Sequence, residues 1–522
     1  MTYEKCCKKG LAIGFIFFIL LLAITNQDSL CSAFDGLDQK ASFSTKVSSI
    51  HDTYVKNVKW KNTFVNLNGA FMRWTGQRVC NKVARLKNGM LSRVDYSKPD
   101  ARLESTISTT IELKNEIERM GIPFLYINLA GKMNLHHELL PAGFTCFANA
   151  ETDSFLKALV DAGVKTFDAR VCFPNPSADL EKYFYITDHH WNALGALKAA
   201  PSIVRAIEEV LAVSCQDLTC LDSTQWECHV KKGWWLGTAG KRTGRYYGGL
   251  DDLIYLTPKF EMETTVMIPH KNSFRKGDFE ETNLVMKYAQ EKHDLYSTNS
   301  YRLHIGGDHP LVHSLTPQAP ISQKVLIVKD SYLNPLIGFL SSMFQQLDVI
   351  DMRYFKDSSL LEYIAQTQPD LVVMMLSHSQ RHHVISMSKK RVNESIGPWK
   401  EKKVVKEYPE FVVKKDKWAY NYQVVDYPLA LGKTYHLDIE KVDILEGKTE
   451  GLSIALYDPT TKKAVMRDLF DIEYANAQGG FHRMFKVPSK GSVQLIIYSG
   501  VAGAAQNISV KCKNLRLTEC VE

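Results

Sequence analysis

The sequence predicts an α/β domain with a mainly parallel sheet, followed by an all-β domain. In the first part, apolar runs typical of buried strands alternate with segments whose apolar residues recur at helical spacing. Such alternation is typical of a parallel sheet covered by helices. After about residue 395, short β-type runs punctuated by turn residues replace the helical patterns, which favours a β-sandwich. The chain, at 522 residues, is long enough for two or three domains.

Each predicted element rests on its own pattern of apolar and turn residues. Pro201 predicts a break in the helix that contains it. The glycine-rich, aromatic and basic stretch 214–320 predicts a large insertion on the ligand side of the sheet. In chain order, we expect an exposed strand and turn over 64–78, a helix over 101–121, strands over 122–130 and 183–187, a helix and strand within 153–170, a helix over 193–212, strands starting at 324, 347 and 369, a helix over 358–367, and the sandwich over 396–522.

The N-terminus predicts export. A basic start precedes the apolar run LAIGFIFFILLLAI at 11–24. This run is short for a spanning helix, which needs about 20 residues, and suits the apolar region of a signal peptide. We therefore interpret 1–26 as a signal peptide or an N-terminal anchor that meets the membrane through 10–25. Either reading sends 27–522 out of the cytoplasm, to the cell envelope or the extracellular space.

Cysteine usage agrees with export. Nine cysteines follow residue 26, and disulfides persist in oxidising compartments. Cys512 and Cys520 are close enough in sequence to predict a local disulfide. Cys215, Cys220 and Cys228 could instead bind zinc with a neighbouring histidine, but their spacing matches no common zinc pattern, so disulfide use is favoured.

Overall charge argues against one class of partner. The net charge of +7 is small for this length, and the sequence has no dense run of basic and aromatic residues. We therefore expect no nucleic-acid partner.

A serine follows one of the predicted strands. In VLIVKDSYLNP (325–335), an apolar strand runs directly into Asp330 and Ser331, and a helix-like segment follows. A serine placed there lies at the carboxyl end of a parallel strand, where open α/β sheets bind their ligands. The N–H groups at the start of a helix can stabilise an oxyanion. Asp-Ser is also a common helix cap, so this motif alone is weak evidence for catalysis.

A second motif, TDHHWN, supplies a base and an orienting carboxylate. It also follows a predicted strand and precedes a helix, which predicts the same edge of the sheet. His190 would take a proton from a serine, and Asp188 would fix the tautomer of His190. His189 is expected to point elsewhere and to make a structural hydrogen bond. The alternative is that Asp188 or Asn192 caps the helix and the histidines are incidental.

Other proteins with an Asp-His-His run fit less well. Manganese phosphoesterases need further aspartate clusters, which the sequence lacks at suitable places, and palmitoyltransferases have a cysteine where Trp191 stands and several membrane spans. Calcium or zinc binding by Asp188, His189 and His190 together is also disfavoured. We therefore predict no metal and no organic cofactor.

Together the two motifs resemble the DHHW-type relatives of the alginate O-acetyltransferases, in the SGNH hydrolase superfamily. The resemblance covers roughly 60–385 and extends to VNLNGAFMRWTG, LKNGML, GKRTGRYYGGLDDL, GGDHPLV and IDMRYF. It implies an SGNH-like fold over 27–395. It also implies that Ser331, His190 and Asp188 form a catalytic triad that transfers or hydrolyses acetyl esters on polysaccharides.

The chain departs from the superfamily pattern at two points. The usual Gly-Asp-Ser is Lys329-Asp330-Ser331 here, and the usual Gly-x-Asn-Asp is replaced by Ser-His-Ser-Gln at 377–380. The sequence therefore does not identify a single oxyanion donor. We expect the donors among the Ser331 N–H, Asn334, Ser379 and Gln380.

Four further residues are candidates for substrate binding. Arg353 and Tyr354 follow a strand and could face the same crevice, while Arg242 and Tyr246 belong to a glycine-rich loop. Arginines bind carboxylates with two hydrogen bonds, and aromatic rings stack on sugars. The alternative interpretation is that these four residues are ordinary surface or packing residues with no role in substrate binding.

The predicted function is that of an O-acetyltransferase acting on an exported polysaccharide. The resemblance implies an acetyl-serine intermediate and a membrane acyltransferase as acetyl donor. One alternative is a carbohydrate acetylesterase with the same triad. The other is a non-catalytic, glycan-binding envelope protein, to which aromatic residues of the β-sandwich, such as those in KWAYNYQ (417–423), would contribute.

Overall fold

The structure is a computed structural model. The residues that it describes are 17, 20–21, 24–35, 42–94, 100–291, 294–388, 400–415, 422–449, 451–499 and 508–521.

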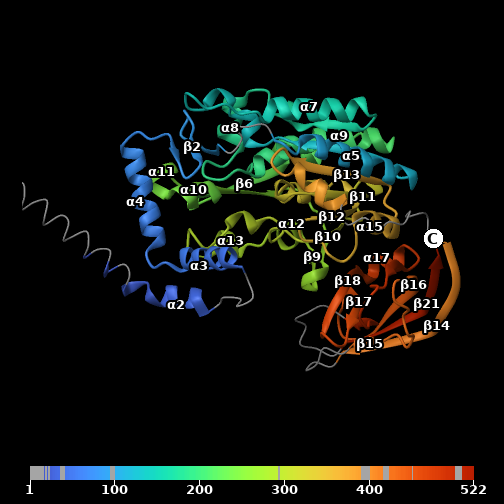
Figure 1. The fold of residues 1–522 in the computed structure, drawn as a ribbon. Coiled ribbons are helices and arrows are strands. Elements are labelled where there is room, and N and C mark those ends of the chain that lie inside the picture. The colour runs from blue at the N-terminus through green and yellow to red at the C-terminus, as the bar shows by residue number, and fades with distance from the viewer. Residues whose placement is uncertain are drawn as a thin grey trace, which may run out of the picture.

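A mixed eight-stranded sheet forms the centre of the first part of the chain (Figure 1). Five neighbouring strands are parallel, and the other three extend the sheet in antiparallel fashion. The predicted α/β class with a mainly parallel sheet is therefore confirmed. In spatial order the strands are β5 (Lys165–Asp168), β4 (Phe124–Leu129), β13 (Leu371–Ser377), β11 (Ile321–Lys329), β12 (Phe344–Ile350), β10 (Leu311–Leu315), β8 (Thr264–Ile268) and β9 (Ser273–Gly277).

Helices cover both faces of this sheet because alternate strand residues point to opposite sides. In β11, Leu326 and Val328 pack on one side, whereas Val325 and Ile327 pack on the other. The first face is covered by α5 (Leu103–Arg119), α7 (Ala148–Asp161) and α15 (Leu360–Thr367). The second face is covered by α9 (Ala193–Leu211) and α14 (Leu336–Ser341).

Four local predictions need correction. The segment predicted as a strand and turn over 64–78 is largely the helix α4 (Lys61–Trp74). Residues 183–187 form no strand, and only Phe184 makes an isolated bridge, to Trp191. Pro201 lies inside α9, which continues past it because apolar residues on both sides of the proline are buried. The insertion 214–320 contributes β8, β9 and β10 to the main sheet.

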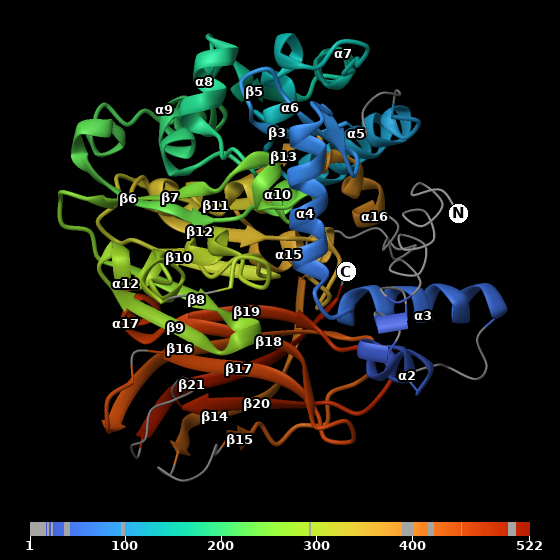
Figure 2. The ribbon, with the colours of Figure 1, turned by 90° about the vertical axis from the view of Figure 1, so that its left-hand side faces the viewer.

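The C-terminal part is all-β, as predicted. Two four-stranded antiparallel sheets enclose a shared apolar core (Figure 2). One contains β14 (Lys400–Lys415), β21 (Ile508–Val521), β16 (Thr434–Glu446) and β19 (Phe481–Lys486); the other contains β15 (Tyr422–Val424), β20 (Gln494–Ser499), β17 (Gly451–Asp458) and β18 (Lys463–Asp471). Most of the KWAYNYQ stretch lies outside the described residues.

The predicted Cys512–Cys520 disulfide is absent. Both cysteines are buried in the single strand β21 and are not bonded to each other. Eight positions along a strand correspond to about 26 Å, far beyond the Cα separation that a disulfide can bridge. Within the described residues, Cys215, Cys220 and Cys228 form no disulfide either.

The predicted N-terminal anchor falls mostly on residues outside the described part of the chain. No helix among the described residues is long and apolar enough to cross a membrane.

Candidate active site

Ser331 lies just beyond the carboxyl end of β11, as its strand pattern predicts. It begins a short 3-10 turn, Ser331–Leu333, which Asp330 caps by accepting a hydrogen bond from the Tyr332 N–H at 2.9 Å. The other Asp330 oxygen accepts hydrogen bonds from the N–H and hydroxyl of Ser377, at 2.8 and 2.6 Å. This buried carboxylate therefore fixes the serine turn to the end of the neighbouring strand β13.

The segment before His190 is an irregular loop held by two buried charges. Lys132 donates to the main-chain carbonyls of Leu91, at 3.0 Å, of Asp188, at 2.6 Å, and of Tyr185. Asp251 accepts hydrogen bonds from the N–H groups of Ile186 and Thr187. Burial lowers the pKa of Lys132 to about 8 and raises the pKa of Asp251 to about 6.

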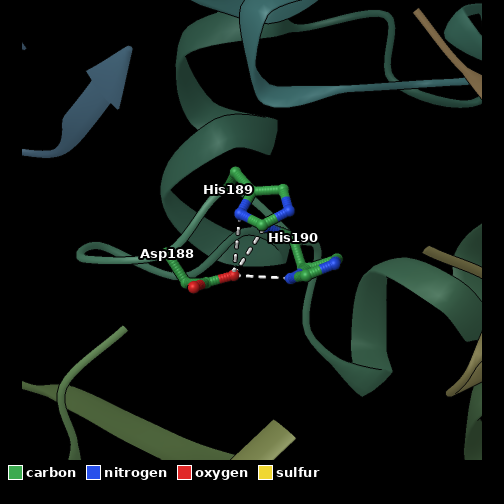
Figure 3. Close-up of side chains that lie close together, drawn as sticks. All are labelled: Asp188, His189 and His190. Atoms are coloured by element: carbon green, nitrogen blue, oxygen red, sulfur yellow. Dashed lines mark hydrogen bonds and ion pairs between the residues drawn. The ribbon is translucent and has the colours of Figure 1, made fainter. Parts of the chain in front are cut away.

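The structure brings Asp188, His190 and Ser331 into one hydrogen-bonded chain. His190 Nδ1 lies 2.5 Å from Asp188 Oδ1 (Figure 3), and His190 Nε2 lies 2.7 Å from Ser331 Oγ. Both ring nitrogens are thus engaged, one by a carboxylate and one by a hydroxyl. This geometry suits a general base that takes the serine proton while its tautomer is fixed from behind.

Asp188 is held as a carboxylate from several directions. Its second oxygen accepts a hydrogen bond from the Thr238 N–H at 2.7 Å. Burial acts to raise the pKa of Asp188, but the imidazoles of His189 and His190 and these hydrogen bonds outweigh burial and hold the pKa well below its usual range. Gly237 packs so closely that an added Cβ would lie 2.7 Å from the Asp188 Cα.

His189 does not point away from the site, contrary to our expectation. Its Nδ1 lies 3.4 Å from Asp188 Oδ1, and its ring centroid is 3.8 Å from that of His190 (Figure 3). Together with Asp188 and His190 it could meet a metal ion geometrically. However, the Asp188 and His190 atoms already form the chain to Ser331, so a metal would compete with that chain.

Aromatic rings fix the position of the His190 imidazole. Tyr301 stacks on it with a centroid distance of 4.1 Å and an interplanar angle of 15°. The Tyr301 hydroxyl donates to the Ser331 carbonyl at 3.1 Å, and Trp191 Nε1 donates to the Tyr332 carbonyl at 2.7 Å. Tyr301 therefore contacts both the base and the main chain of the nucleophile, in addition to the direct hydrogen bond between His190 and Ser331.

The predicted oxyanion donors differ in availability. Within the described part of the chain, the Ser331 N–H makes no hydrogen bond, and Ser379 and Gln380 line a cavity of about 100 Å³ beside Tyr332. By contrast, Asn334 Nδ2 donates to Asp308 at 3.0 Å, and Asn334 Oδ1 accepts from Lys329 at 2.6 Å. The Asn334 side chain is therefore held by Asp308 and Lys329, and its role as an oxyanion donor stays a prediction.

The departure from Gly-Asp-Ser has a structural explanation. Lys329, where the superfamily has glycine, is almost fully buried and lies 2.9 Å from Asp308 and 3.5 Å from Asp351. Arg353 completes the cluster with two hydrogen bonds to Asp351, at 2.8 and 2.6 Å. Its guanidinium is thus held by protein carboxylates, and substrate binding by Arg353 stays a prediction.

The other predicted substrate residues are divided between cavity and surface. Arg242 lines the cavity together with Arg93, and among the described lining residues there is no aspartate or glutamate. Tyr354 is half exposed beside Arg353. Tyr246 lies outside the cavity lining, and its hydroxyl accepts a hydrogen bond from Arg245 at 2.7 Å.

Sequence reasoning missed several residues of the site. Lys132 and Asp251 clamp the loop, Tyr301 and Tyr332 pack around His190, and His378 pairs with the buried Glu151 at 2.8 Å. Of these residues, only Lys132 could have been found from the sequence. It follows the buried strand β4, and the carboxyl ends of such strands are where α/β sheets place their functional residues.

The fold and the site together define an α/β domain with a serine, histidine and aspartate at the carboxyl edge of its sheet. Residues 91–245 match the family model described as SGNH hydrolase-like domain, acetyltransferase AlgX. The resemblance predicted from the motifs is thereby confirmed, and acyl-transfer chemistry is supported in broad terms. The matched stretch contains Asp188 and His190 and ends before Ser331. No curated protein matches the chain.

Three solved structures illustrate what the chain is similar to. Bacillus cereus PatB1 is 18% identical and covers 56% of this chain and 95% of its own, with a TM-score of 0.48. A DHHW family protein from Eubacterium siraeum is 19% identical, with 59% and 96% covered and a TM-score of 0.44. Pseudomonas aeruginosa AlgX is 14% identical, with 84% and 94% covered and a TM-score of 0.34.

Proposed function

We propose that this chain is an exported O-acetyltransferase that modifies a polysaccharide through an acetyl-serine intermediate on Ser331. The observation that carries the proposal is the continuous hydrogen-bonded chain from Asp188 through His190 to Ser331. An isolated serine hydroxyl is a poor nucleophile, and a positioned base with an oriented tautomer is what activates it. The match to an acetyltransferase family model supports acetyl as the transferred group.

The reaction would proceed in two half-reactions. Ser331 Oγ attacks the acetyl carbonyl while His190 Nε2 takes the serine proton. The oxyanion collapses, His190 returns the proton to the departing oxygen of the donor, and acetyl-Ser331 remains. An acceptor hydroxyl then gives its proton to His190 and attacks the acetyl-serine, and His190 returns the proton to the departing Ser331 Oγ, which regenerates the serine hydroxyl. The Ser331 N–H, Ser379 and Gln380 are the candidate oxyanion donors.

The acceptor class follows from the cavity beside the triad. Arg93 and Arg242 line it, and no acidic side chain does so among the described lining residues. Arginine pairs with carboxylates through two hydrogen bonds. A polysaccharide that carries negative charge therefore fits better than a neutral one, and a membrane acyltransferase is the proposed acetyl donor.

Intact-mass measurement on the full chain tests this proposal. Incubation with an activated acetyl ester, or with a serine-reactive fluorophosphonate, should add one adduct to the wild type. The adduct should be absent in Ser331→Ala and strongly slowed in His190→Ala. If a folded wild-type chain forms no adduct, the protein is a glycan-binding relative without this chemistry. Rapid loss of the acetyl group to water, whatever sugar is offered, would instead identify an esterase.

A further inference from the structure

The helix α4 presents an apolar surface that the fold leaves uncovered by any described residue. Trp60, Leu67, Phe71 and Trp74 are exposed by 50, 59, 55 and 83%. The spacing of four and three positions places Leu67, Phe71 and Trp74 along one face of the helix, and Trp60 is the residue that precedes its first turn. Phe71 and Trp74 also contact each other, with ring centroids 6.1 Å apart. Exposed apolar groups gathered in this way usually mark a surface with a partner.

The opposite face of α4 is fixed to the body of the protein. Gly69 approaches the Thr243 carbonyl of α10 (Thr238–Thr243) so closely that an added Cβ would clash with it. Asn66 accepts a hydrogen bond from the Arg245 N–H at 2.9 Å, at the start of α11 (Arg245–Gly248). Figure 1 shows α4 beside α10 and α11, and Figure 2 also shows it beside α10. The apolar face therefore cannot turn inward without breaking these contacts.

The surroundings of this face carry positive charge. Residues 53–94 contain nine lysines and arginines and no aspartate or glutamate. Lys61, Arg73 and Arg78 are exposed in or just after α4, and Arg245 is exposed on the adjoining α11. Lys59, which precedes the helix, is paired with Asp28 at 3.7 Å. The uncovered face is thus apolar and aromatic at its centre and basic around it.

We propose that this face of α4 binds an anionic lipid membrane and holds the acyl-transfer domain on the lipid surface. Tryptophan and other aromatic rings favour the membrane–water interface, and basic side chains favour anionic headgroups. Fourteen residues make α4 about 21 Å long, too short to span the apolar core of a bilayer, so the helix would lie in the interface. The described residues of the nearby apolar stretch, Phe17, Leu20, Leu21 and Ile24, are exposed as well.

A second copy of the chain fits this surface less well. Helix pairs favour leucine, isoleucine or valine at the contact positions and opposite charges beside them. Here three of the four exposed residues, Trp60, Phe71 and Trp74, are aromatic, and no acidic residue of 53–94 could pair with the basic ones. Two such faces would repel each other at their edges.

Membrane binding at α4 would place the active site near the lipid. Thr238, the first residue of α10, donates its N–H to Asp188, and Thr243, the last, meets α4. Arg242 of the same short helix lines the cavity beside the triad. One helix therefore separates the lipid-facing surface from the catalytic carboxylate, which suits a donor group delivered at the membrane.

The test uses lipid contact as a local readout, because the apolar stretch 11–24 could itself tether every variant. Full-length protein is added to vesicles of phosphatidylcholine with or without phosphatidylglycerol, each containing brominated lipid that quenches nearby tryptophan. We expect quenching on the anionic vesicles that falls by more than half in Trp60→Phe with Trp74→Phe, and that weakens with added salt. Trp234→Phe, which removes a half-buried tryptophan of β6 (Trp226–Trp235), should leave it unchanged.

A second pair of variants distinguishes the loss of lipid contact from the loss of the tryptophans that report it. Leu67→Ser with Phe71→Ser keeps every tryptophan and should halve the quenching, whereas Val230→Ser with Ile444→Ser, at exposed apolar residues elsewhere, should not. Equal quenching in wild type and both α4 variants would overturn the proposal. Self-association that depends on Leu67 and Phe71, or a tryptophan response to a soluble oligouronate without lipid, would also overturn it, in favour of a second copy or a glycan.

Discussion

At the residue scale, the carboxylate of Asp188 decides which nitrogen of His190 carries the proton. Asp188→Asn keeps the size of the side chain but can donate to Nδ1, which would place the proton on Nε2 and remove the base that faces Ser331. We expect acyl transfer, followed as acetyl-enzyme formation, to slow by about ten-thousand-fold.

His189→Gln is the matched control for this prediction. Its side chain is 40% exposed and makes no contact with Ser331, and Tyr332 donates to its main-chain carbonyl, which the substitution keeps. The rate should fall by less than about a hundredfold, the low end of a general acid–base contribution. A loss in His189→Gln as large as that in Asp188→Asn would mean that the histidine roles are exchanged.

Of the triad, only Ser331 could be placed from its local pattern, because it directly follows the buried strand β11. His190 and Ser331 are 141 positions apart, and the segment before His190 is a loop rather than the predicted strand, so their pairing was expected from the resemblance of the two motifs to a known family. The role of Lys329 could not be predicted in this way. Its partners Asp308 and Asp351 come from separate segments, and nothing in the local pattern distinguishes a buried lysine from an exposed one.

At the element scale, the start of α10 has to pass very close to Asp188. Gly237→Ala places a methyl group against the Asp188 backbone, 2.7 Å from its N and Cα. The carboxylate must then move, and a displacement of about 1 Å in a catalytic group can cost about a hundredfold in rate. We expect a loss of that size with the fold retained, measured as acylation rate beside a circular dichroism spectrum.

Thr238→Ala is the matched control, because it changes the next residue of the same turn. It removes the side chain but keeps the N–H that donates to Asp188 at 2.7 Å. Its acylation rate should therefore remain close to that of the wild type. Equal losses in Gly237→Ala and Thr238→Ala would show that the turn tolerates no change at all and would refute the steric explanation.

The loop before His190 depends on the Lys132 side chain rather than on strand pairing. Lys132→Met keeps the apolar stem but leaves the carbonyls of Leu91, Tyr185 and Asp188 without this donor. Because an unsatisfied buried acceptor costs about 1–3 kcal/mol, we expect the free energy of unfolding to fall by about 3 kcal/mol in urea titrations. Lys157→Met, at a 76% exposed ion pair, should change it by less than about 0.5 kcal/mol.

This loop also explains why residues 183–187 were predicted wrongly as a strand. Their aromatic and β-branched residues have strand propensity, but propensity reports packing on a half-buried surface. Here Phe184 and Tyr185 are buried in aromatic clusters. The main-chain groups bond to the side chains of Lys132 and Asp251. Only a single main-chain hydrogen bond, from the Leu91 N–H to the Ile186 carbonyl, joins the described loop to a strand. The segment 64–78 was missed for the complementary reason, because a helix with an apolar outer face gives no clear amphipathic pattern.

At the scale of the whole molecule, a buried ionic cluster joins the α/β part to the β-sandwich. His313 of β10 lies between two carboxylates, with Nδ1 2.6 Å from Asp348 Oδ1 in β12 and Nε2 3.0 Å from Asp468 Oδ1 in β18. Arg483 Nε of β19 lies 2.9 Å from the other Asp468 oxygen. Because His313 bridges carboxylates from both parts of the molecule, this contact is strongest when the imidazole is protonated.

This contact predicts that stability falls in mildly alkaline solution. Burial acts to lower the pKa of His313, but Asp348 and Asp468 outweigh it and raise the pKa to about 9 from a usual 6.5. The stabilisation is therefore complete below pH 6.5 and is lost as the pH rises through about 9, which amounts to about 3 kcal/mol. Lys132, with a pKa of about 8, acts in the opposite direction above that pH, so the comparison must be made between variants.

Urea unfolding at several pH values between about 6 and about 10 tests this contact in wild type, His313→Gln and His482→Gln. His482 also contacts a carboxylate, Asp438 at 2.6 Å, but its side chain is 56% exposed, and an exposed pair contributes at most about 1 kcal/mol. Loss of stability with rising pH should therefore persist in His482→Gln and largely disappear in His313→Gln, which is already destabilised at pH 6. If His313→Gln retains the full pH dependence, the proton that matters is bound elsewhere, and the two parts of the molecule are held together by packing rather than by this histidine.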